Sequence, residues 1–197
     1  MTTTSKETAM RASQIKLQLD HILDPRNVYF LGVFARDTLP EVSVHTRFPA
    51  CLVVNSESSN GRGEHWLAIY YLDNKRCEFF DSYAFPLGLY GLSKYLSKFI
   101  VLSQVKYPLQ ANDSSVCGHY CIYYLYYRSL GLTMDFITQQ FDSNDLNSND
   151  KHVLEAVTHN FSHYPSATHH SLCTCPNQTC FSRSLFLSRC KILHKSH

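Results

Sequence analysis

The chain has 197 residues, enough for one domain with a substantial core and too few for two domains of ordinary size. Hydrophobic residues make up 44%, which argues against a disordered chain, and no apolar run approaches the roughly 18 residues of a membrane span. The 18 basic and 16 acidic residues nearly cancel, and the polar stretch Met1–Asp20 lacks the apolar core of a secretory signal. We therefore expect an intracellular protein that has no contact with a membrane and is not secreted.

The first half of the chain predicts one helix and four strands. Helical spacing of Ile15, Leu19 and Ile22 predicts a helix that ends near His21, opened by a capping box at 4–7. Strands are predicted at 28–35, 50–55, 65–72 and 76–81, with a polar loop at 56–63. The last two strands form a hairpin around a turn at 73–75. Apolar residues occupy both faces of this hairpin, which indicates a central position in the sheet.

The second half predicts a strand among several helices. Helices are expected at 92–99, 116–130, 134–141 and 151–161, with a strand at 100–105 and a polar loop at 110–115. Ser114 or Ser115 can cap the long helix, and Gly131 ends it. The pattern disappears after Phe161. We therefore predict an α+β domain over 1–161, with a central mixed sheet flanked by helices, and a poorly ordered tail over 162–197.

The tail is basic and rich in cysteine and histidine. It holds four basic residues and no acidic one from residue 156 onward, which allows weak contact with nucleic acid but lacks the charge density of a dedicated binding surface. Its candidate zinc ligands are Cys173, Cys175, Cys180, Cys190, His169, His170 and His194. Their spacing matches no usual finger or ribbon, so we expect no zinc here and read the tail as an extension.

Cys117 is the candidate nucleophile, because it lies in the first turn of the long helix. The free N–H groups at a helix start lower the pKa of a thiol and favour the thiolate. Gly118 beside it leaves room for a substrate backbone. The alternative is a merely buried cysteine, which is how we interpret Cys121 one turn later.

A nucleophilic cysteine needs a base, and His65 is the best placed of the 11 histidines. It opens the first hairpin strand, and Asp81 closes the second with the same parity, so both side chains project from one face at one end, directly or diagonally opposed. A carboxylate there would orient the imidazole and stabilise its charged form. His119 points away from Cys117, and Glu78 has the wrong parity. A surface His–Asp pair is the alternative interpretation.

Gln110 supplies a fourth part of a catalytic site. It lies in the loop before the long helix, and its neutral amide, together with the Cys117 N–H, can form an oxyanion hole. Trp66 follows His65 directly, so its indole can form a wall of the cleft and bind substrate together with Gly118.

These residues resemble the adenain and ubiquitin-like-protease superfamily of cysteine proteases. The resemblance rests on the order His65, Asp81, Gln110, Cys117 and on the segments 29–34, 63–68 and 115–121, which are closest to adenoviral proteases. Over residues 10–160 the chain is also similar to proteases of virus-like Maverick/Polinton elements. The resemblance implies a circularly permuted papain-like fold and a thiol endopeptidase that cleaves virus-like precursor proteins, often beside glycine, as in virion maturation.

The chain differs from the adenoviral proteases in two respects, and the resemblance has further implications. Adenoviral proteases use glutamate where Asp81 stands, and no cysteine lies between Cys77 and Cys117 to tether an activating peptide through a disulfide. The chemistry needs no cofactor, although the family allows a peptide or DNA activator. A virus-encoded protein would also be found in the virion. The alternatives are a protease that removes ubiquitin-like modifiers of the SUMO type, and a catalytically silent binding module with the same fold.

Overall fold

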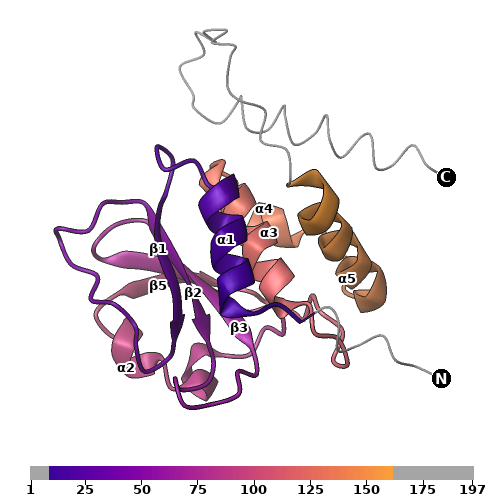
Figure 1. Ribbon diagram of the computed structural model, residues 1–197, viewed down its shortest axis with the longest axis horizontal. Helices are drawn as coiled ribbons and strands as arrows, with labels where there is room; N and C mark the ends of the chain where they lie inside the picture. The colour runs from indigo at the N-terminus through magenta and orange to yellow at the C-terminus, as the bar shows by residue number, and fades with distance from the viewer. Residues whose placement is uncertain (1–8, 162–197) are drawn as a thin grey trace, which may run out of the picture.

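A five-stranded sheet forms the centre of the structure, a computed structural model that describes residues 9–161 (Figure 1). The strands lie in chain order: β1 (Tyr29–Ala35), β2 (Ala50–Asn55), β3 (Trp66–Tyr71), β4 (Arg76–Phe80) and β5 (Ile100–Gln104). The two outer pairs, β1–β2 and β4–β5, are parallel, and the inner pairs are antiparallel. The predicted α+β class with a central mixed sheet flanked by helices is confirmed.

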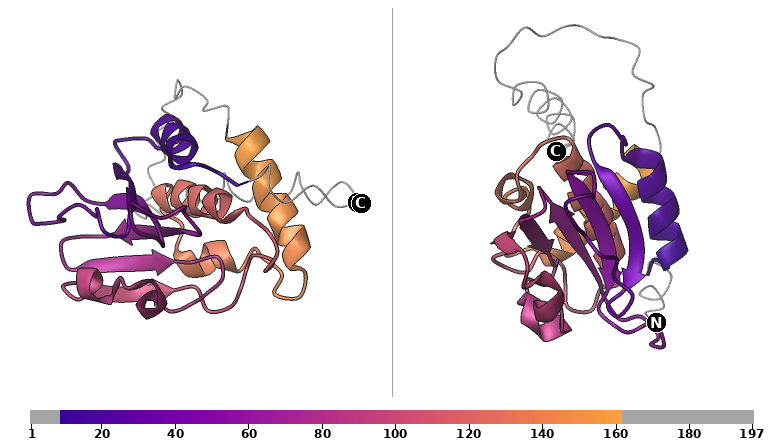
Figure 2. Two further views of the ribbon diagram at one scale, coloured as in Figure 1. Left: turned by 60° about the horizontal axis from the view of Figure 1, so that its bottom comes forward. Right: turned by 90° about the vertical axis from the view of Figure 1, so that its left-hand side faces the viewer.

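Helices cover both faces of this sheet (Figure 2). One face packs against α1 (Ala12–Ile22), α3 (Cys117–Ser129), α4 (Met134–Thr138) and α5 (Leu146–Glu155). The other face packs against η1 (Leu87–Tyr90), α2 (Ser93–Leu96) and the segments around them. Alternate residues of a strand point to opposite faces, so Cys51 and Val53 join the first core while Leu52 and Val54 join the second. The double cover explains why β2 is buried along its whole length.

The hairpin of β3 and β4 lies inside the sheet, as its apolar faces predict. Ile69 pairs with Phe79 and Ala68 with Phe80, and β2 borders β3 on its other side. All positions of β4 except Arg76 are buried. This register sets which side chains meet at the open end of the hairpin.

Several helices differ from the prediction. The helix expected at 92–99 is only the four residues of α2, preceded by the 3₁₀ turn η1. The last helix begins at Leu146, five residues early, because the Asp145 side chain caps it by accepting from the Ser148 N–H. It continues as a π-helical turn, η2 (Ala156–Asn160). Hydrophobic periodicity missed its first turns because the inward positions there include two polar residues, Asn149 and Asp150.

The expected serine cap of α3 is wrong. Val116 holds the N-cap position and its side chain makes no capping bond, while the Ser114 hydroxyl oxygen accepts from the Gln110 amide. The capping box at 4–7 and the whole 162–197 tail, with its candidate zinc ligands, lie outside the described residues. Within residues 9–161, no helix is long and apolar enough to span a bilayer.

Candidate active site

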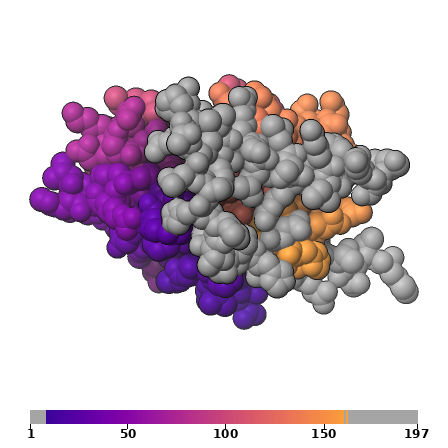
Figure 3. Space-filling view, turned by 90° about the horizontal axis from the view of Figure 1, so that it is seen from above, coloured from indigo at the N-terminus to yellow at the C-terminus, as the bar shows by residue number. Residues whose placement is uncertain are grey.

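The candidate site lies at one end of the sheet, where the ends of two strands come close to the start of helix α3. His65 directly precedes β3, Asp81 directly follows β4, and Cys117 is the first residue of α3 on the helical face. The open end of the hairpin thus holds the imidazole and the carboxylate, while the helix start brings the thiol over the same edge. In the space-filling view, the purple segments that follow α1 lie at the left end of the molecule and the later helices, in orange, lie toward the right, with α1, in indigo, at the lower edge between them (Figure 3).

His65 and Asp81 are in direct contact. The distance from His65 Nε2 to Asp81 Oδ1 is 2.6 Å, and both side chains are buried. Extending the β3–β4 register places Tyr83 opposite His65, so Asp81 reaches the imidazole diagonally. The sequence left the direct and diagonal arrangements open, and the register decides for the diagonal one.

The Asp81 carboxylate is held by four donors. Besides His65 it accepts from the Tyr83 N–H at 2.9 Å, the Phe85 N–H at 2.9 Å and the Tyr90 hydroxyl at 2.7 Å. Only 1% of Asp81 is exposed, so water does not replace these donors and each hydrogen bond stabilises the carboxylate. The carboxylate is therefore fixed in one orientation, which in turn fixes the imidazole plane.

His65 is also hydrogen-bonded to Cys117. Burial alone would lower the pKa of His65, but the hydrogen bonds to Asp81 and Cys117 and their negative charges outweigh it and raise that pKa to about 9. Because Nε2 is occupied by Asp81, Nδ1 is the ring nitrogen left for the sulfur. An imidazolium beside a thiol favours the thiolate, so the geometry suits a nucleophile–base pair oriented by a carboxylate.

The raised pKa of His65 predicts a pH-dependent contribution to stability. A group with a folded-state pKa of about 9 against an ordinary 6.5 stabilises the fold fully below the lower value and loses that effect as pH rises through the upper one. We expect the difference in free energy of unfolding between wild type and His65→Gln to be larger at about pH 5.5 than at about pH 9.5. Urea titrations at both pH values measure it.

The matched control is His45→Gln, because His45 is exposed. Its effect on the free energy of unfolding should be less than about 0.5 kcal/mol, as for most exposed substitutions. A pH-independent effect of His65→Gln would contradict the assignment of His65 as a charged, hydrogen-bonded base.

Gln110 is fully buried and lies beside the site, with its amide already engaged. Its Oε1 accepts from the Ser82 hydroxyl at 2.7 Å. Its Nε2 lies 2.9 Å from the Ser114 Oγ, 3.1 Å from the Ser114 carbonyl and 3.1 Å from the Tyr83 hydroxyl. Two amide hydrogens thus face three acceptors. An oxyanion would have to take the place of one of these acceptors to receive a bond from Gln110.

Tyr83 links the imidazole to Gln110. Its ring lies 4.8 Å from the His65 ring, and its hydroxyl donates to the Ser114 carbonyl at 3.1 Å while accepting from Gln110. Sequence reasoning gave this tyrosine no role in the site. The shared parity of residues 65, 81 and 83 was the signal that could have found it.

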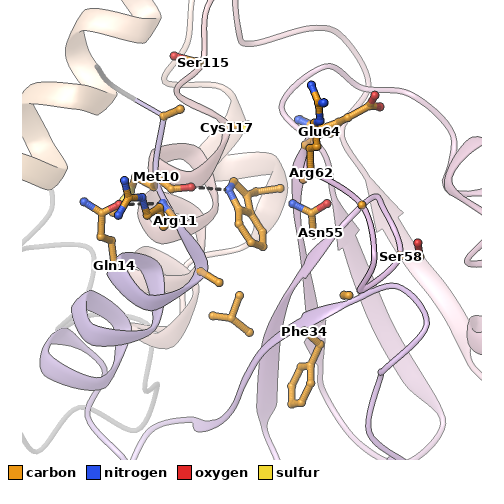
Figure 4. Close-up of a pocket in the computed structure, with 18 of the residues that line it drawn as sticks. Met10, Arg11, Gln14, Phe34, Asn55, Ser58, Arg62, Glu64, Ser115 and Cys117 are labelled. Atoms are coloured by element: carbon orange, nitrogen blue, oxygen red, sulfur yellow. Dashed lines mark hydrogen bonds between the residues drawn. The ribbon is translucent and has the colours of Figure 1, made fainter. Parts of the chain in front are cut away.

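Trp66 lies in the wall of the site, as expected, and its indole is fixed. The indole Nε1 donates to the Met10 carbonyl at 2.9 Å, a bond drawn in Figure 4. Met10 thereby ties the segment before α1 to the residue that follows His65. Nothing in the sequence pattern pointed to Met10.

Gly118 differs from its expected part in substrate binding. A Cβ built on it would lie 3.0 Å from Ile15 Cδ1, 3.1 Å from Met10 Cβ and 3.3 Å from Trp66 Cδ1. The space beside this glycine is therefore filled by the protein's own side chains. Its small size lets α1 and Trp66 approach the start of α3.

Gly118→Ala is accordingly expected to destabilise the fold by about 1 kcal/mol, because overpacking costs more than the helix propensity that alanine adds. Gly88→Ala is the control, since the nearest neighbour of a Cβ there is Ser93 Oγ at 3.4 Å. It should change the free energy of unfolding by less than about 0.5 kcal/mol in urea titrations. Equal effects of the two substitutions would refute the packing role of Gly118.

A groove of about 1000 Å³ opens at Cys117 (Figure 4). One wall is formed by the residues before and at the start of α1, including Arg11 and Gln14, and the other by the loop after β2, including Asn55 and Arg62. His65, Trp66, Tyr83, Ser114 and Ser115 also line it. Its volume is that of a site for an extended peptide segment or a similar ligand.

The other three cysteines among residues 9–161 and His119 lie outside the site. Cys51, Cys77 and Cys121 are free and buried, and burial raises the pKa of Cys121 well above its ordinary value. Burial lowers the pKa of His119 to about 4, so this histidine is neutral at pH 7. Over residues 9–161, no group of three His, Cys, Asp or Glu side chains could hold a metal ion.

Comparisons with known proteins give distant structural neighbours only. No family model matches the chain, and no curated protein does. The central domain of an uncharacterized Lpg1148 protein from Legionella pneumophila has a TM-score of 0.40 at 17% identity, covering 77% of this chain and 98% of that one. The ASFV pS273R protease has a TM-score of 0.42 at 14% identity, covering 75% and 68%. At these scores neither likeness says anything about the activity of this chain, and the resemblance of its motifs to a protease superfamily stays a prediction.

Proposed function

We propose that this protein is a cysteine endopeptidase. The observation that carries the proposal is the buried contact of 2.6 Å between His65 and Asp81, with Cys117 hydrogen-bonded to the same imidazole at the start of a helix. A thiol, a base and an orienting carboxylate in this order are the parts that acyl transfer requires. The adjoining groove gives a peptide access to the sulfur.

The chemistry follows from these positions. Cys117 Sγ attacks the scissile carbonyl carbon, and the His65 imidazolium donates its proton to the leaving amine. His65 then accepts a proton from water as the water attacks the thioester, and Cys117 leaves as thiolate. Asp81 keeps the ring in orientation throughout. The Cys117 N–H and the Gln110 amide stabilise the oxyanion once Gln110 gives up one of its present acceptors.

The substrates we propose are precursor proteins cut beside small residues, above all glycine. The Trp66 indole, fixed by its bond to Met10, forms a rigid part of the groove next to His65. A cleft bounded by a rigid indole admits a backbone without a Cβ more easily than one with a branched side chain. A protease that removes ubiquitin-like modifiers would share this preference.

Peptide cleavage tests the proposal. The full chain is incubated with short fluorogenic peptides that carry glycine on both sides of one bond, with the same peptides carrying valine, and with a folded ubiquitin-like protein joined to a reporter through Gly-Gly. We expect the glycine peptides to be cut and the valine peptides to resist. Cleavage of the folded fusion alone would favour modifier removal, because such an enzyme draws most of its binding energy from the folded partner.

The binding-module alternative predicts a different result. A silent module would cut none of these substrates, and its Cys117 would react with iodoacetamide no faster than an ordinary buried thiol. Rapid alkylation at neutral pH together with cleavage would exclude it.

A further inference from the structure

Helix α5 reaches the loop that carries Gln110 with two consecutive buried side chains, Asn149 and Asp150. The Asn149 amide donates to the Leu109 carbonyl at 3.1 Å and to the Asp142 carbonyl at 2.7 Å. The Asn149 carbonyl accepts from the Asp142 N–H at 2.9 Å. Asn149 therefore fastens the loop to the start of α5, and both its amide nitrogen and its oxygen are bonded to backbone groups.

Asp150 contacts the same loop nearer to the site. Its Oδ2 accepts from the Ala111 N–H at 3.3 Å, and its Oδ1 lies 3.0 Å from the Tyr120 hydroxyl. It also forms a hydrogen bond with Ser114. Of these partners, Ala111 directly follows Gln110, Ser114 is hydrogen-bonded to the Gln110 amide, and Tyr120 lies in the first turn of α3.

Ser114 connects Asp150 to Gln110. A serine hydroxyl has one proton and two lone pairs. Because Ser114 gives its proton to Asp150, its oxygen is left to accept, and the Gln110 Nε2 donates to that oxygen at 2.9 Å. At its other end, the Gln110 carbonyl is held by the Ser82 hydroxyl. The orientation of the amide thus depends on Asp150 through the direction of one hydroxyl proton.

The protons around Tyr120 show what kind of side chain position 150 needs. The Tyr120 hydroxyl lies 2.8 Å from the Leu109 carbonyl and 3.0 Å from Asp150 Oδ1, yet it has a single proton. The Leu109 carbonyl also accepts from the Asn149 amide at 3.1 Å, so the Tyr120 proton can go to Asp150 Oδ1. Asp150 thus accepts from Tyr120, from Ser114 and from the Ala111 N–H, and burial raises its pKa against the effect of these hydrogen bonds. Asparagine has the same shape and keeps a side-chain oxygen that can accept from Ser114 and from the Ala111 N–H.

We propose that Asp150 is a positioning residue that acts through Ser114 to hold the Gln110 amide where it can serve the oxyanion. The inference rests on the proposed peptidase function. The hydrogen bonds of Asp150 go to Ala111, Ser114 and Tyr120 and not to Cys117 or His65, so its effect is on transition-state stabilisation and leaves the thiol unchanged.

The kinetic test compares four variants on a glycine peptide. We expect Asp150→Ala and Ser114→Ala each to lower kcat by about 10–100-fold, and their double variant to lose no more than either alone. Asp150→Asn should stay within about 3-fold of wild type. Alkylation of Cys117 should remain within about 2-fold of wild type in all four. Asp145→Asn, an exposed change at the cap of the same helix, is the control and should leave kcat unchanged.

Three results would overturn the proposal: an equal loss of alkylation and kcat in Asp150→Ala, losses that multiply in the double variant, or Asp150→Asn as slow as Asp150→Ala. The first would indicate a structural role for the helix, the second would remove Ser114 as the link, and the third would show that charge is what matters.

A measurement without substrate separates this inference from the proposed function. The side-chain amide of Gln110 is identified in a ¹⁵N NMR spectrum by its loss in Gln110→Ala. We expect its resonances to shift and its hydrogens to exchange faster in Asp150→Ala, and to stay as in wild type in Asp150→Asn. If the wild-type protein cut no peptide, the proposed peptidase function would be refuted. The NMR comparison would still decide whether Asp150 positions Gln110. Unchanged resonances in Asp150→Ala would refute the link.

Discussion

Cys117→Ala is expected to abolish peptide cleavage, by at least about 10⁴-fold in kcat, and to leave the fold intact. The Cys117 sulfur interacts directly with the imidazole of the buried His65–Asp81 pair. Cys117 is the first residue of α3 and alanine is a good helix former, so the substitution removes chemistry and little packing. Turnover of a glycine peptide and the melting temperature, measured on the same preparation, check both statements.

Cys121→Ala is the matched control. Cys121 lies one turn further along α3, is fully buried, and has a pKa raised well above the ordinary value by that burial. Its removal should lower the melting temperature and spare most of kcat, because the lost contacts belong to the core. If Cys121→Ala abolished cleavage and Cys117→Ala did not, the nucleophile would be assigned to the wrong cysteine.

Asp81→Asn is expected to lower kcat by about 10²–10⁴-fold. The amide keeps one acceptor oxygen where the carboxylate serves four donors, and its NH₂ group, if turned to His65 Nε2, would favour the wrong tautomer of the imidazole. The charge of Asp81 also helps to raise the pKa of His65. We therefore expect the pKa of His65 in the variant to fall, moving the pH profile of Cys117 alkylation with it.

Tyr90→Phe tests whether Asp81 acts through its negative charge or through its hydrogen bonds to the 81–90 segment. It removes one of the four hydrogen bonds to Asp81 and keeps the negative charge beside His65. A loss of less than about 10-fold in kcat is expected, measured on the same peptide. Equal losses in Tyr90→Phe and Asp81→Asn would show that Asp81 acts by holding the 81–90 segment together and has no part in a triad.

Much of the central layer could be predicted from local patterns. The apolar runs that became β2, β3 and β4 have residues on both faces that must be buried, so their place inside the sheet follows from composition and the period of two. The parity argument for His65 and Asp81 worked for the same reason, since side chains alternate across a strand whatever surrounds it. The same alternation excluded Glu78 from the site. In the structure, Glu78 is instead paired with Arg128 of α3, with 2.8 Å between Arg128 Nε and Glu78 Oε2.

Polar groups that are buried were poorly predicted. The first turns of α5 were missed because Asn149 and Asp150 point inward, where periodicity expects apolar residues. The serine cap of α3 was wrong because the Ser114 side chain is hydrogen-bonded to Gln110 in the same loop and to Asp150 on α5. Local capping rules cannot weigh such tertiary competitors.

Sequence spacing alone was enough to place His65 and Asp81 at one end of a hairpin and Cys117 in the first turn of a helix, and hence to identify which thiol, imidazole and carboxylate could meet. These depend on spacing along the chain, which local geometry converts into direction. Tertiary contacts set three further features: Asp81 reaches His65 diagonally, Gly118 packs against Met10 and Trp66, and the Gln110 amide is already engaged. Register, close packing and the sharing of protons among buried groups depend on distances between elements far apart in sequence, and no local pattern encodes those distances.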